Sequence, residues 1–398
     1  MTMGPRQVAE QHPAGPMGEE GRPELAPGTI IKLPEAKVVS FEEMMRDLRG
    51  VRIIYLGESH DNLAHHRGQL RVIEALQARG RPVAIGMEMF QRPFQPVLDA
   101  WVAGEIDEKE FLRRSDWYER WSMDFSLYQP ILEHARGHGN RILALNATDE
   151  LVRAVGSKGI AGLTEEQAAQ LPEVYLGRSE HRHFIEHLYQ AHGTMHHRNS
   201  FEQFYEAQRV WDETMAEAIG DYLRQPGAAQ YLAVIAGNGH IEYGLGIPDD
   251  VLRRTGAPYR IISFQEAGRV SWEPGPGPPT PTFDYGRPLA HYVWVTEESE
   301  VEARPKLGVT VGEKAEGEVG VKIDAVAPGS PAAKAGLKSG DLILSVDGEE
   351  TETLGDLRYA LSRRKMGEQV GVEFLRGGKR EAVRLTLSPL PKMDTPKR

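Results

Sequence analysis

Three short apolar segments of this chain each lead to side chains that can hold a metal ion or move a proton. The segments and the polar residues that follow them are 51–56 with Glu58 and His60, 83–86 with Glu88, and 231–236 with His240. Each segment is rich in Ile, Val, Leu or Ala and is bounded by Gly or Pro, which predicts buried strands. Because ligands bind at the carboxyl ends of strands in an open parallel sheet, we expect these four side chains to converge on one crevice.

Two imidazoles and two carboxylates form a nitrogen and oxygen donor set that suits Zn, Mn, Fe or Co. A glutamate such as Glu88 inside an apolar run is costly unless it is paired or bound to metal. In a hydrolase, either Glu58 or Glu88 would be the base beside a bound water. The alternative is a buried network of ion pairs and hydrogen bonds that ties the strand ends together.

The composition bounds the class of protein. A length of 398 residues predicts two domains, and 40% hydrophobic with 26% charged residues is ordinary for globular proteins. The net charge of -11 argues against binding nucleic acid, which needs a basic face. The absence of cysteine excludes disulfides and thiolate metal sites. No stretch approaches 18 apolar residues, so no membrane span is expected.

The two ends of the chain differ from its interior. Residues 1–36 are rich in Pro, Gly and Glu and lack an apolar core segment, so they are predicted to be a disordered leader rather than a signal peptide. Without a signal peptide or a lipid-anchor cysteine, the sequence as read predicts a cytoplasmic protein. A different true start would make a periplasmic or envelope-associated location the expectation. Residues 391–398 are predicted to be a frayed tail.

Strand-like and helix-like segments alternate between residues 37 and 300. Helices are predicted at 62–79, 94–102, 108–114, 127–137 and 164–225, and further strands at 141–145, 259–264 and, as a last edge strand, 292–295. This alternation predicts an α/β domain with a mostly parallel sheet, helices on both faces and a helical insertion. The Pro/Gly-rich residues 272–290 are predicted to form a strap or linker.

From residue 305 to 390 the sequence changes to short alternating strands, one short helix and Gly-rich turns. Residues 326–348, VAPGSPAAKAGLKSGDLILSVDG, resemble a bacterial PDZ domain, which implies a small β-rich module that binds a peptide or protein C-terminus as an added strand. The matching peptide-binding residues are Leu307, Gly308, Val309 and Thr310 in the carboxylate loop, and Leu354, Leu357 and Leu361 on the groove helix at 353–363. A PDZ fold kept only as a packing partner is the alternative.

Four motifs in the first domain occur in a fixed order. They are YLGESHD at 55–61, GMEMF at 86–90, QRVWDETMA at 208–216 and GNGH at 237–240. Together they resemble the ChaN family of haem-binding uptake proteins, within the Tiki-like and erythromycin-esterase-like superfamily. The resemblance covers residues 37–300 and implies haem or iron as the cofactor, with a role in iron acquisition or haem handling. ChaN relatives are typically exported lipoproteins, and this sequence departs from them in lacking a signal and a cysteine.

The same superfamily implies a second function. Tiki-like relatives use the matching glutamate and histidines as metal-dependent hydrolases. In that case the donor set of Glu58, His60, Glu88 and His240 would hold Zn, Mn or Co, and the PDZ domain would recruit the substrate. A third interpretation is a scaffold whose first domain has lost its ligand.

Arg209 and Asp212 lie three residues apart on a predicted amphipathic helix at 201–223, so they share one side of it. Arg209 is a candidate for neutralising a substrate or propionate carboxylate. Asp212 is a candidate for orienting a site histidine. A plain ion pair within the helix is the alternative.

A histidine-rich segment precedes that helix. Its histidines are His181, His183, His187, His192, His196 and His197. His183 and His187 have the four-residue spacing that suits metal or haem ligation on a helix, and Tyr189 and Tyr205 add phenolate candidates for ferric haem. In the functional interpretation this segment covers the crevice or forms the face of a haem-sharing homodimer. Exposed histidines on a helical arm are the alternative.

Overall fold

The computed structural model describes residues 25–191, 200–268, 285–299, 304–312, 315 and 317–389. Its internal contacts divide the chain into two compact units, one of Met1–Glu88 with Leu145–Ser299 and one of Met89–Ala144 with Glu300–Arg398. The predicted tail, most of the predicted strap and the first 24 residues of the predicted leader lie outside the described residues.

The larger sheet has eight strands in the order β2-β1-β8-β7-β3-β6-β4-β5. The strands are β1 (Ile30–Lys32), β2 (Lys37–Val39), β3 (Ile53–Glu58), β4 (Val83–Gln91), β5 (Ile142–Asn146), β6 (Tyr231–Gly237), β7 (Tyr259–Glu266) and β8 (Tyr292–Thr296). β3 runs parallel to β6 and β7, β4 runs parallel to β6, and β7 runs parallel to β8. β1 is antiparallel to both of its neighbours. The prediction of a mostly parallel sheet is confirmed.

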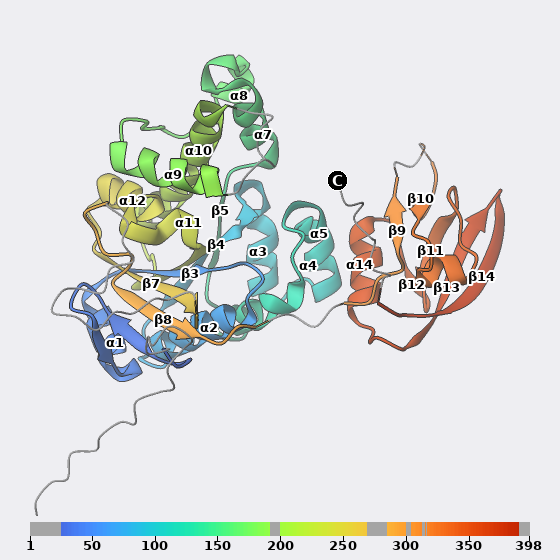
Figure 1. Ribbon diagram of the computed structural model, residues 1–398, viewed down its shortest axis with the longest axis horizontal. Helices are drawn as coiled ribbons and strands as arrows, with labels where there is room; N and C mark the ends of the chain where they lie inside the picture. The colour runs from blue at the N-terminus through green and yellow to red at the C-terminus, as the bar shows by residue number, and fades with distance from the viewer. Residues whose placement is uncertain are drawn as a thin grey trace, which may run out of the picture. The chain divides into compact units, whose positions relative to one another are not determined.

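Helices cover both faces of this sheet, as predicted (Figure 1). α1 (Phe41–Asp47) and α2 (Leu63–Gln77) lie on one side, and α11 (Asn238–Ile241) and α12 (Ile247–Thr255) lie on the other. Coverage on both faces explains the composition of the central strands. β3 and β6 are buried along their whole length, and a strand buried on both faces has a nearly continuous apolar sequence.

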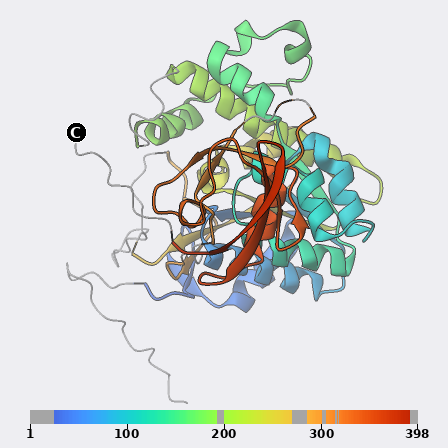
Figure 2. The same cartoon turned by 90° about the vertical axis from the view of Figure 1, so that its right-hand side faces the viewer.

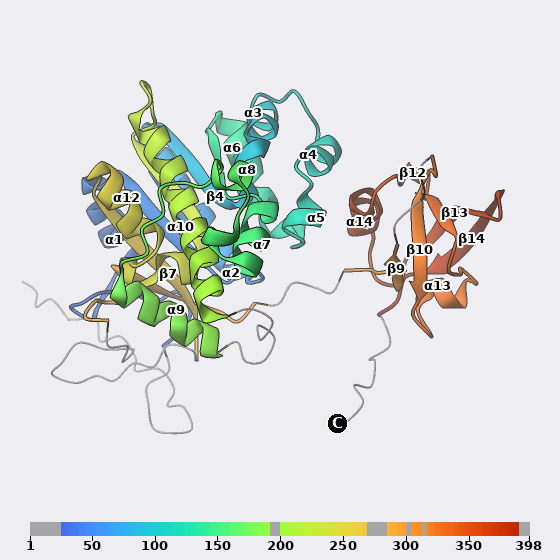
Figure 3. The same ribbon diagram turned by 90° about the horizontal axis from the view of Figure 1, so that it is seen from above.

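The helical insertion consists of α7 (Asp149–Lys158), α8 (Glu165–Ala168), α9 (Ser179–Ala191) and α10 (Phe201–Arg224). The 24-residue α10 contacts α7, α9 and α12 (Figure 3). The prediction of one continuous helical region at 164–225 was wrong, because residues 171–178 have no regular secondary structure. Pro172 explains the break, since proline disfavours a helical conformation of the preceding residue and donates no backbone hydrogen bond.

Two further predictions need correction, one about an edge strand and one about the leader. The strand at 292–295 was expected at an edge, but β8 lies between β7 and β1. The reason is that β1, inside the range predicted as a disordered leader, pairs with β8 through Ile30–Lys32. Ordered backbone therefore begins before residue 36.

The second unit contains the helices α3 (Gln95–Val102), α4 (Glu108–Arg114), α5 (Trp117–Arg120) and α6 (Gln129–His138). Buried aromatic rings pack between them. The ring centroids of Trp101 and Phe111 are 4.8 Å apart, and those of Trp117 and Tyr128 are 5.4 Å apart. Short 3-10 turns elsewhere in the chain are η1 (Leu48–Gly50), η2 (Arg92–Phe94), η3 (Phe125–Leu127), η4 (Ile160–Gly162) and η6 (Glu242–Gly244).

The same unit holds the small β-rich domain predicted at the C-terminus. Its elements are β9 (Val309–Val311), β10 (Val321–Val326), α13 (Pro331–Lys334), β11 (Leu342–Val346), β12 (Glu349–Glu350), α14 (Leu354–Ser362), β13 (Gln369–Arg376) and β14 (Lys379–Thr386). The strands form an antiparallel sheet in the order β14-β13-β11-β10-β9, with β12 beside β11. β13 and β14 form a long twisted hairpin (Figure 2). Within the ranges described above, every helix is too short or too polar to cross a bilayer.

Candidate functional site

The predicted chemistry-bearing residues come from three neighbouring strands. Glu58 is the last residue of β3, and it pairs in register with Gly237 at the end of β6. Glu88 lies on β4, one residue beyond Met87, which pairs with Ile235 of β6. Because the three strands are parallel and adjacent, their carboxyl ends lie at the same edge of the sheet.

Gly237 is the point where these side chains meet. A Cβ atom added there would lie 2.9 Å from Cε1 of His60 and 3.6 Å from Oε2 of Glu88. The backbone N–H of Gly237 donates to Oε2 of Glu88 at 2.7 Å, and Nε2 of His240 lies 3.4 Å from the other oxygen of that carboxylate. The structure therefore brings His60, Glu88 and His240 together, and we call them with Glu58 the strand-end cluster.

Glu58 anchors one side of the strand-end cluster. Its side chain is fully buried, with Oε1 2.8 Å from Nδ1 of His60. Its other oxygen accepts a hydrogen bond of 2.8 Å from Gln69 on α2 and lies 3.4 Å from Nδ1 of His66. The His60 side chain is 32% exposed, which makes it the most open member of the cluster.

His240 is held from both ring nitrogens. Its Nδ1 lies 2.6 Å from Oδ1 of Asp212 and 3.0 Å from Nε2 of Gln208, both on α10, while its Nε2 faces Glu88. Asp212 also lies 3.2 Å from Nε2 of the buried His181 on α9. One carboxylate thus lies between two imidazoles, and the orienting role expected of Asp212 stays a prediction.

These contacts set the charges of the strand-end cluster. Burial alone would lower the pKa of His240, but the carboxylates of Glu88 and Asp212 more than offset this and raise it to about 10. Burial would raise the pKa of Glu88, but the charges of His240 and His60 lower it to about 2. Burial also opposes ionisation of Asp212, yet its hydrogen bonds to His181 and His240 hold its pKa well below the usual range. The carboxylates of Glu88 and Asp212 and the imidazole of His240 are therefore charged at neutral pH.

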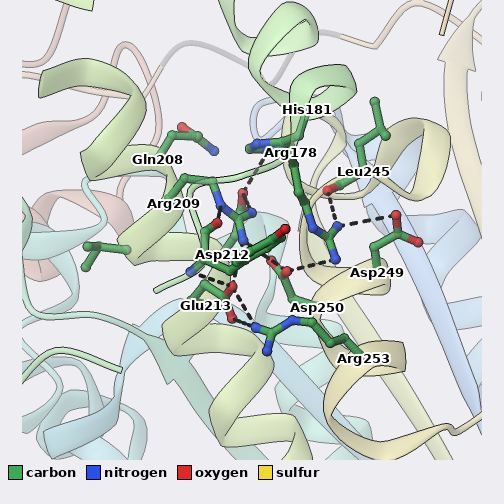
Figure 4. Close-up of polar contacts among 12 residues, drawn as sticks. Arg178, His181, Gln208, Arg209, Asp212, Glu213, Leu245, Asp249, Asp250 and Arg253 are labelled. Atoms are coloured by element: carbon green, nitrogen blue, oxygen red, sulfur yellow. Dashed lines mark hydrogen bonds and ion pairs between the residues drawn. The ribbon is translucent and has the colours of Figure 1, made fainter. Parts of the chain in front are cut away.

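A second layer of buried charges lies behind Asp212 (Figure 4). The guanidinium of Arg209 is fully buried, and its Nη2 lies 2.7 Å from Glu213 and 2.8 Å from Asp250 on α12. Nη1 of Arg209 lies 3.5 Å from Oδ2 of Asp212, and its Nε donates to the carbonyl of Tyr175.

The carboxylate of Glu213 ties three parts of the chain together. Besides Arg209 it accepts hydrogen bonds from Arg253 and Arg254 on α12 and from the backbone N–H of Tyr175. Arg178, which precedes α9, reaches Asp250 at 3.3 Å. Several cations therefore balance the buried carboxylates of α10 and α12.

The haem candidates occupy different environments. His183 and His187 are exposed on α9, their ring centroids are 4.4 Å apart, and Nδ1 of His187 lies 2.6 Å from the hydroxyl oxygen of Tyr285. Tyr189 packs against the rings of Phe201 and Phe204 on α10. Tyr205 is buried, and its hydroxyl donates to the carbonyl of Arg178. His192, His196 and His197 lie outside the described residues.

The predicted peptide-binding residues, apart from Thr310, line a groove of about 500 Å³. Leu307 and Gly308 precede β9, which is the end strand of its sheet, and Gly308 has a φ of 79° that favours glycine. Val309 lies at the start of β9 and Thr310 is exposed beside it. Leu357 and Leu361 of α14 are buried in the domain core and border the same groove.

Some residues of this region were not singled out by their sequence pattern. Gln69 and His66 hold Glu58 from α2, and Asp250 pairs with Arg209 from a helix 41 residues away. Gln208 begins the motif at 208–216, and its position beside Arg209 is the only sequence feature that indicates a role for it. In the part of the chain that the structure describes, no three His, Asp or Glu side chains are grouped so that they could hold a metal ion. The predicted metal site stays a prediction.

Replacing Asp212 by Asn is expected to lower the pKa of His240 from about 10 toward its usual 6.5, because the variant loses a buried carboxylate. A pH titration of the histidine Cε1–H signals by NMR measures this. The raised pKa means that the imidazolium stabilises the fold fully below about pH 6.5 and less as the pH rises toward 10. Asp221→Asn, on the exposed face of the same helix, is the control. An unchanged His240 titration in Asp212→Asn would contradict the assignment.

Replacing Arg209 by Met is expected to lower the free energy of unfolding by about 3–5 kcal/mol, because it leaves buried carboxylates without their cation. The free energy of unfolding of Arg209→Lys should lie between those of the wild type and Arg209→Met, since lysine keeps the charge but lacks the forked guanidinium. Urea unfolding followed by tryptophan fluorescence measures both. The matched control is Arg224→Met on the same helix, an exposed pair with Asp221 whose loss should cost less than about 0.5 kcal/mol. Equal effects at positions 209 and 224 would be evidence against this account.

Comparison with known proteins places both domains. Residues 44–251, more than half of the chain, match the family model for haem-binding uptake proteins of the Tiki superfamily, ChaN, and residues 305–387 match the PDZ domain model. A solved structure of ChaN of Campylobacter jejuni, described by its cofacial haem binding, is similar with a TM-score of 0.50 and 18% identity. The match covers 67% of this chain and 95% of that one, and at this identity it establishes the fold alone.

Two curated relatives match shorter parts. A probable periplasmic serine endoprotease DegP-like of Marinomonas sp. is 42% identical over 72 residues, 18% of this chain and 15% of the relative. Protein RETICULATA-RELATED 5 of Arabidopsis thaliana is 25% identical over 254 residues, 58% of this chain and 32% of the relative. The chain thus spans a third or less of the length of these relatives. From the family match, this chain belongs to the ChaN family of haem-binding uptake proteins in the Tiki superfamily and carries a C-terminal PDZ domain.

Proposed function

We propose that this chain binds haem through its ChaN domain and the C-terminus of a peptide or protein through its PDZ domain, in haem handling or iron acquisition. Family membership and the cofacial haem binding of the Campylobacter jejuni protein support the haem part. The observation that carries it in this chain is the group formed by His183, His187 and Tyr285.

This group has the chemistry of a haem ligand site. Two exposed imidazoles lie one helical turn apart on α9, and the Tyr285 hydroxyl oxygen is within hydrogen-bond distance of Nδ1 of His187. When Nδ1–H donates to that oxygen, Nε2 carries the lone pair that coordinates iron. Buried aromatic side chains, Phe184 and Tyr243, pack beside Tyr285 and fix its ring.

Haem would supply an iron that His183 or His187 would hold through an imidazole nitrogen. The residues of this chain would hold and orient the two imidazoles, and the aromatic rings beside them would shield one face of the haem. The predicted homodimer would follow if two such faces shared haem between copies.

The strand-end cluster supports a second candidate, the metal-dependent hydrolase. The specific observation is that Glu88 lies between two imidazoles, one of which is oriented by Asp212. Such a set can move protons between a water molecule and a substrate. The donors in the described residues are paired with one another rather than grouped around an ion, so metal content is the property to measure.

Titrating haemin into the purified protein is expected to give a saturable Soret band. His187→Ala should remove most of this affinity, and Tyr285→Phe should weaken it about tenfold by freeing the ligand ring. The matched control is His138→Ala, an exposed histidine on α6 whose Nδ1 lies 2.9 Å from a backbone carbonyl, and it should bind as the wild type does. No Soret band, or equal affinities in all variants, would count against haem ligation by α9.

The hydrolase candidate predicts bound Zn, Mn or Co in elemental analysis and metal-stimulated cleavage of a nitrophenyl ester. Glu58→Gln and Glu88→Gln should then abolish that cleavage, because each removes a carboxylate of the strand-end cluster. Glu105→Gln, on the surface before α4, is the control. Ester cleavage that is equally fast in all variants and indifferent to metal would exclude this candidate.

The PDZ part of the proposal rests on the open edge of β9 beside α14. A peptide could pair with this edge strand while its last side chain enters the groove between Val309 and Leu357. The carbonyls of Leu307 and Gly308 accept hydrogen bonds from Ala332 and Ala327, and these bonds fix the loop that would face the peptide carboxylate.

Six fluorescein-labelled octapeptides, ending in Val, Leu, Ile, Met, Phe or Ala, test this function by fluorescence anisotropy on the full chain. At least one free-acid peptide is expected to bind more tightly than its amidated copy. Leu354→Glu should remove most of this binding, since it puts an unpaired carboxylate in an apolar groove. Met366→Glu, at an exposed position of the same domain, should bind normally. Equal binding of free-acid and amidated peptides would refute carboxylate recognition.

A further inference from the structure

One wall of the PDZ groove is built by residues outside the PDZ sequence. The groove is bordered by the carboxylate loop, β9 and α14, and also by Tyr118, Ser122, Met123 and Asp124. These last four come from α5 and the turn that follows it, in the same compact unit as the PDZ domain. We call residues 118–124 the rim segment.

Polar contacts connect α14 and residues of the PDZ domain near it to the rim segment and α4. The pairs are Arg304 with Asp124, Gly355 with Glu119, Arg358 with the Tyr118 carbonyl, Lys109 with Glu349, Arg113 with Glu352 and Arg363 with Glu108. The rim segment thus supplies an acceptor to the first turn of α14, where Gly355 donates to Glu119 at 2.9 Å, and another to its middle, where Arg358 donates to Tyr118 at 2.6 Å. Two separate contacts on one short helix fix its orientation.

The ion pair of Arg304 with Asp124 lies at the entrance to the carboxylate loop. Arg304 stands three residues before Leu307, its Nη2 lies 3.1 Å from Oδ1 of Asp124, and its Nη1 donates to the carbonyl of Ser362 at the end of α14. Both side chains border the groove, and the Asp124 side chain is 16% exposed. A cation beside the loop is therefore already paired with a carboxylate of the chain itself.

An incoming peptide carboxylate would meet this internal carboxylate at the same cation. Like charges at one site raise the cost of binding, and a cation already paired attracts a second anion less. The rim segment also places Met123 and Tyr118 against the apolar lining formed by Leu354 and Leu357. Before any ligand binds, the cation at this end of the groove is therefore already paired, and part of the apolar lining already has neighbours from the rim segment.

We propose that the rim segment is an internal competitor of the peptide. Asp124 occupies Arg304, and a peptide with a free carboxylate and an apolar last side chain binds at full affinity only when that ion pair opens. The ligand expected in the groove is a peptide C-terminus, because the lining of the groove is apolar and the cation Arg304 lies at one end of it. By thermodynamic linkage, peptide binding weakens the ion pair by the same factor by which the ion pair weakens peptide binding. This inference rests on the proposed peptide-binding function.

The test uses the six labelled octapeptides with the full chain and variants of the rim segment. Asp124→Asn keeps a side-chain oxygen for the hydrogen bond from Ser126 but removes the charge. It should lower the Kd of the free-acid peptide about threefold. Arg304→Gln should weaken the peptide more in the Asp124→Asn background than in the wild type, since the two residues are coupled. The matched control, Asp116→Asn, alters an aspartate on the same stretch that pairs with Arg120 and should leave the affinity unchanged.

A second variant tests the docking without touching the groove lining. Glu119→Ala removes the acceptor for Gly355 and should also tighten the free-acid peptide. If the peptides bind as free acids but Asp124→Asn and Glu119→Ala leave their affinity unchanged or weaken it, the competitor is refuted while the peptide-binding function stands. If no free-acid peptide binds better than its amidated copy in any variant, both the function and the competitor fall.

Discussion

The buried guanidinium of Arg209 is the constraint on which the polar side of the ChaN domain depends. Removing a charge from water is costly unless its partners are also buried and well placed. Arg209 meets this condition with Asp212, Glu213 and Asp250, which come from two helices. Asp212 then has a fixed position from which it holds His240, and His240 in turn reaches Glu88 at the end of the sheet. The position of a strand-end imidazole thus traces back to a helix–helix ion network.

This network also explains why two kinds of histidine occur on neighbouring parts of one domain. His181 is buried within it, and burial lowers its pKa, so it serves the network as a largely neutral ring. His183 and His187 lie on the exposed side of the same helix, outside the network. A helix that packs through one face and exposes the other thus separates buried imidazoles from exposed ones at two-residue spacing.

The sequence pattern predicted those features that depend on local burial. β3, β4 and β6 were recognisable because a strand covered on both faces is nearly all apolar, and the polar residue that ends each one stands out. β1 escaped notice because three residues are too few for a periodic signal, and its loss from the prediction put β8 at an edge. The partners of Arg209 could not be predicted, because Asp250 is brought to it by tertiary packing and periodicity says nothing about which distant charges meet.

The PDZ groove illustrates a related limit. Its own residues were predictable from a motif that carries its turns and its helix, but the rim segment lies about 180 residues earlier and has no motif of its own. Tyr118 and Asp124 belong to a short aromatic-rich stretch whose interior rings pack in a core. The two residues of this stretch that border the groove have no pattern in the sequence that distinguishes a groove wall from other packed or surface positions.

The bare backbone at Gly237 has a consequence for genetics. A single methyl group there would lie 2.9 Å from Cε1 of His60, so the His60 ring would have to shift, whereas its distance of 3.6 Å from Glu88 is an ordinary contact. An allele with alanine at this position would therefore alter the strand-end cluster at its most exposed member, His60.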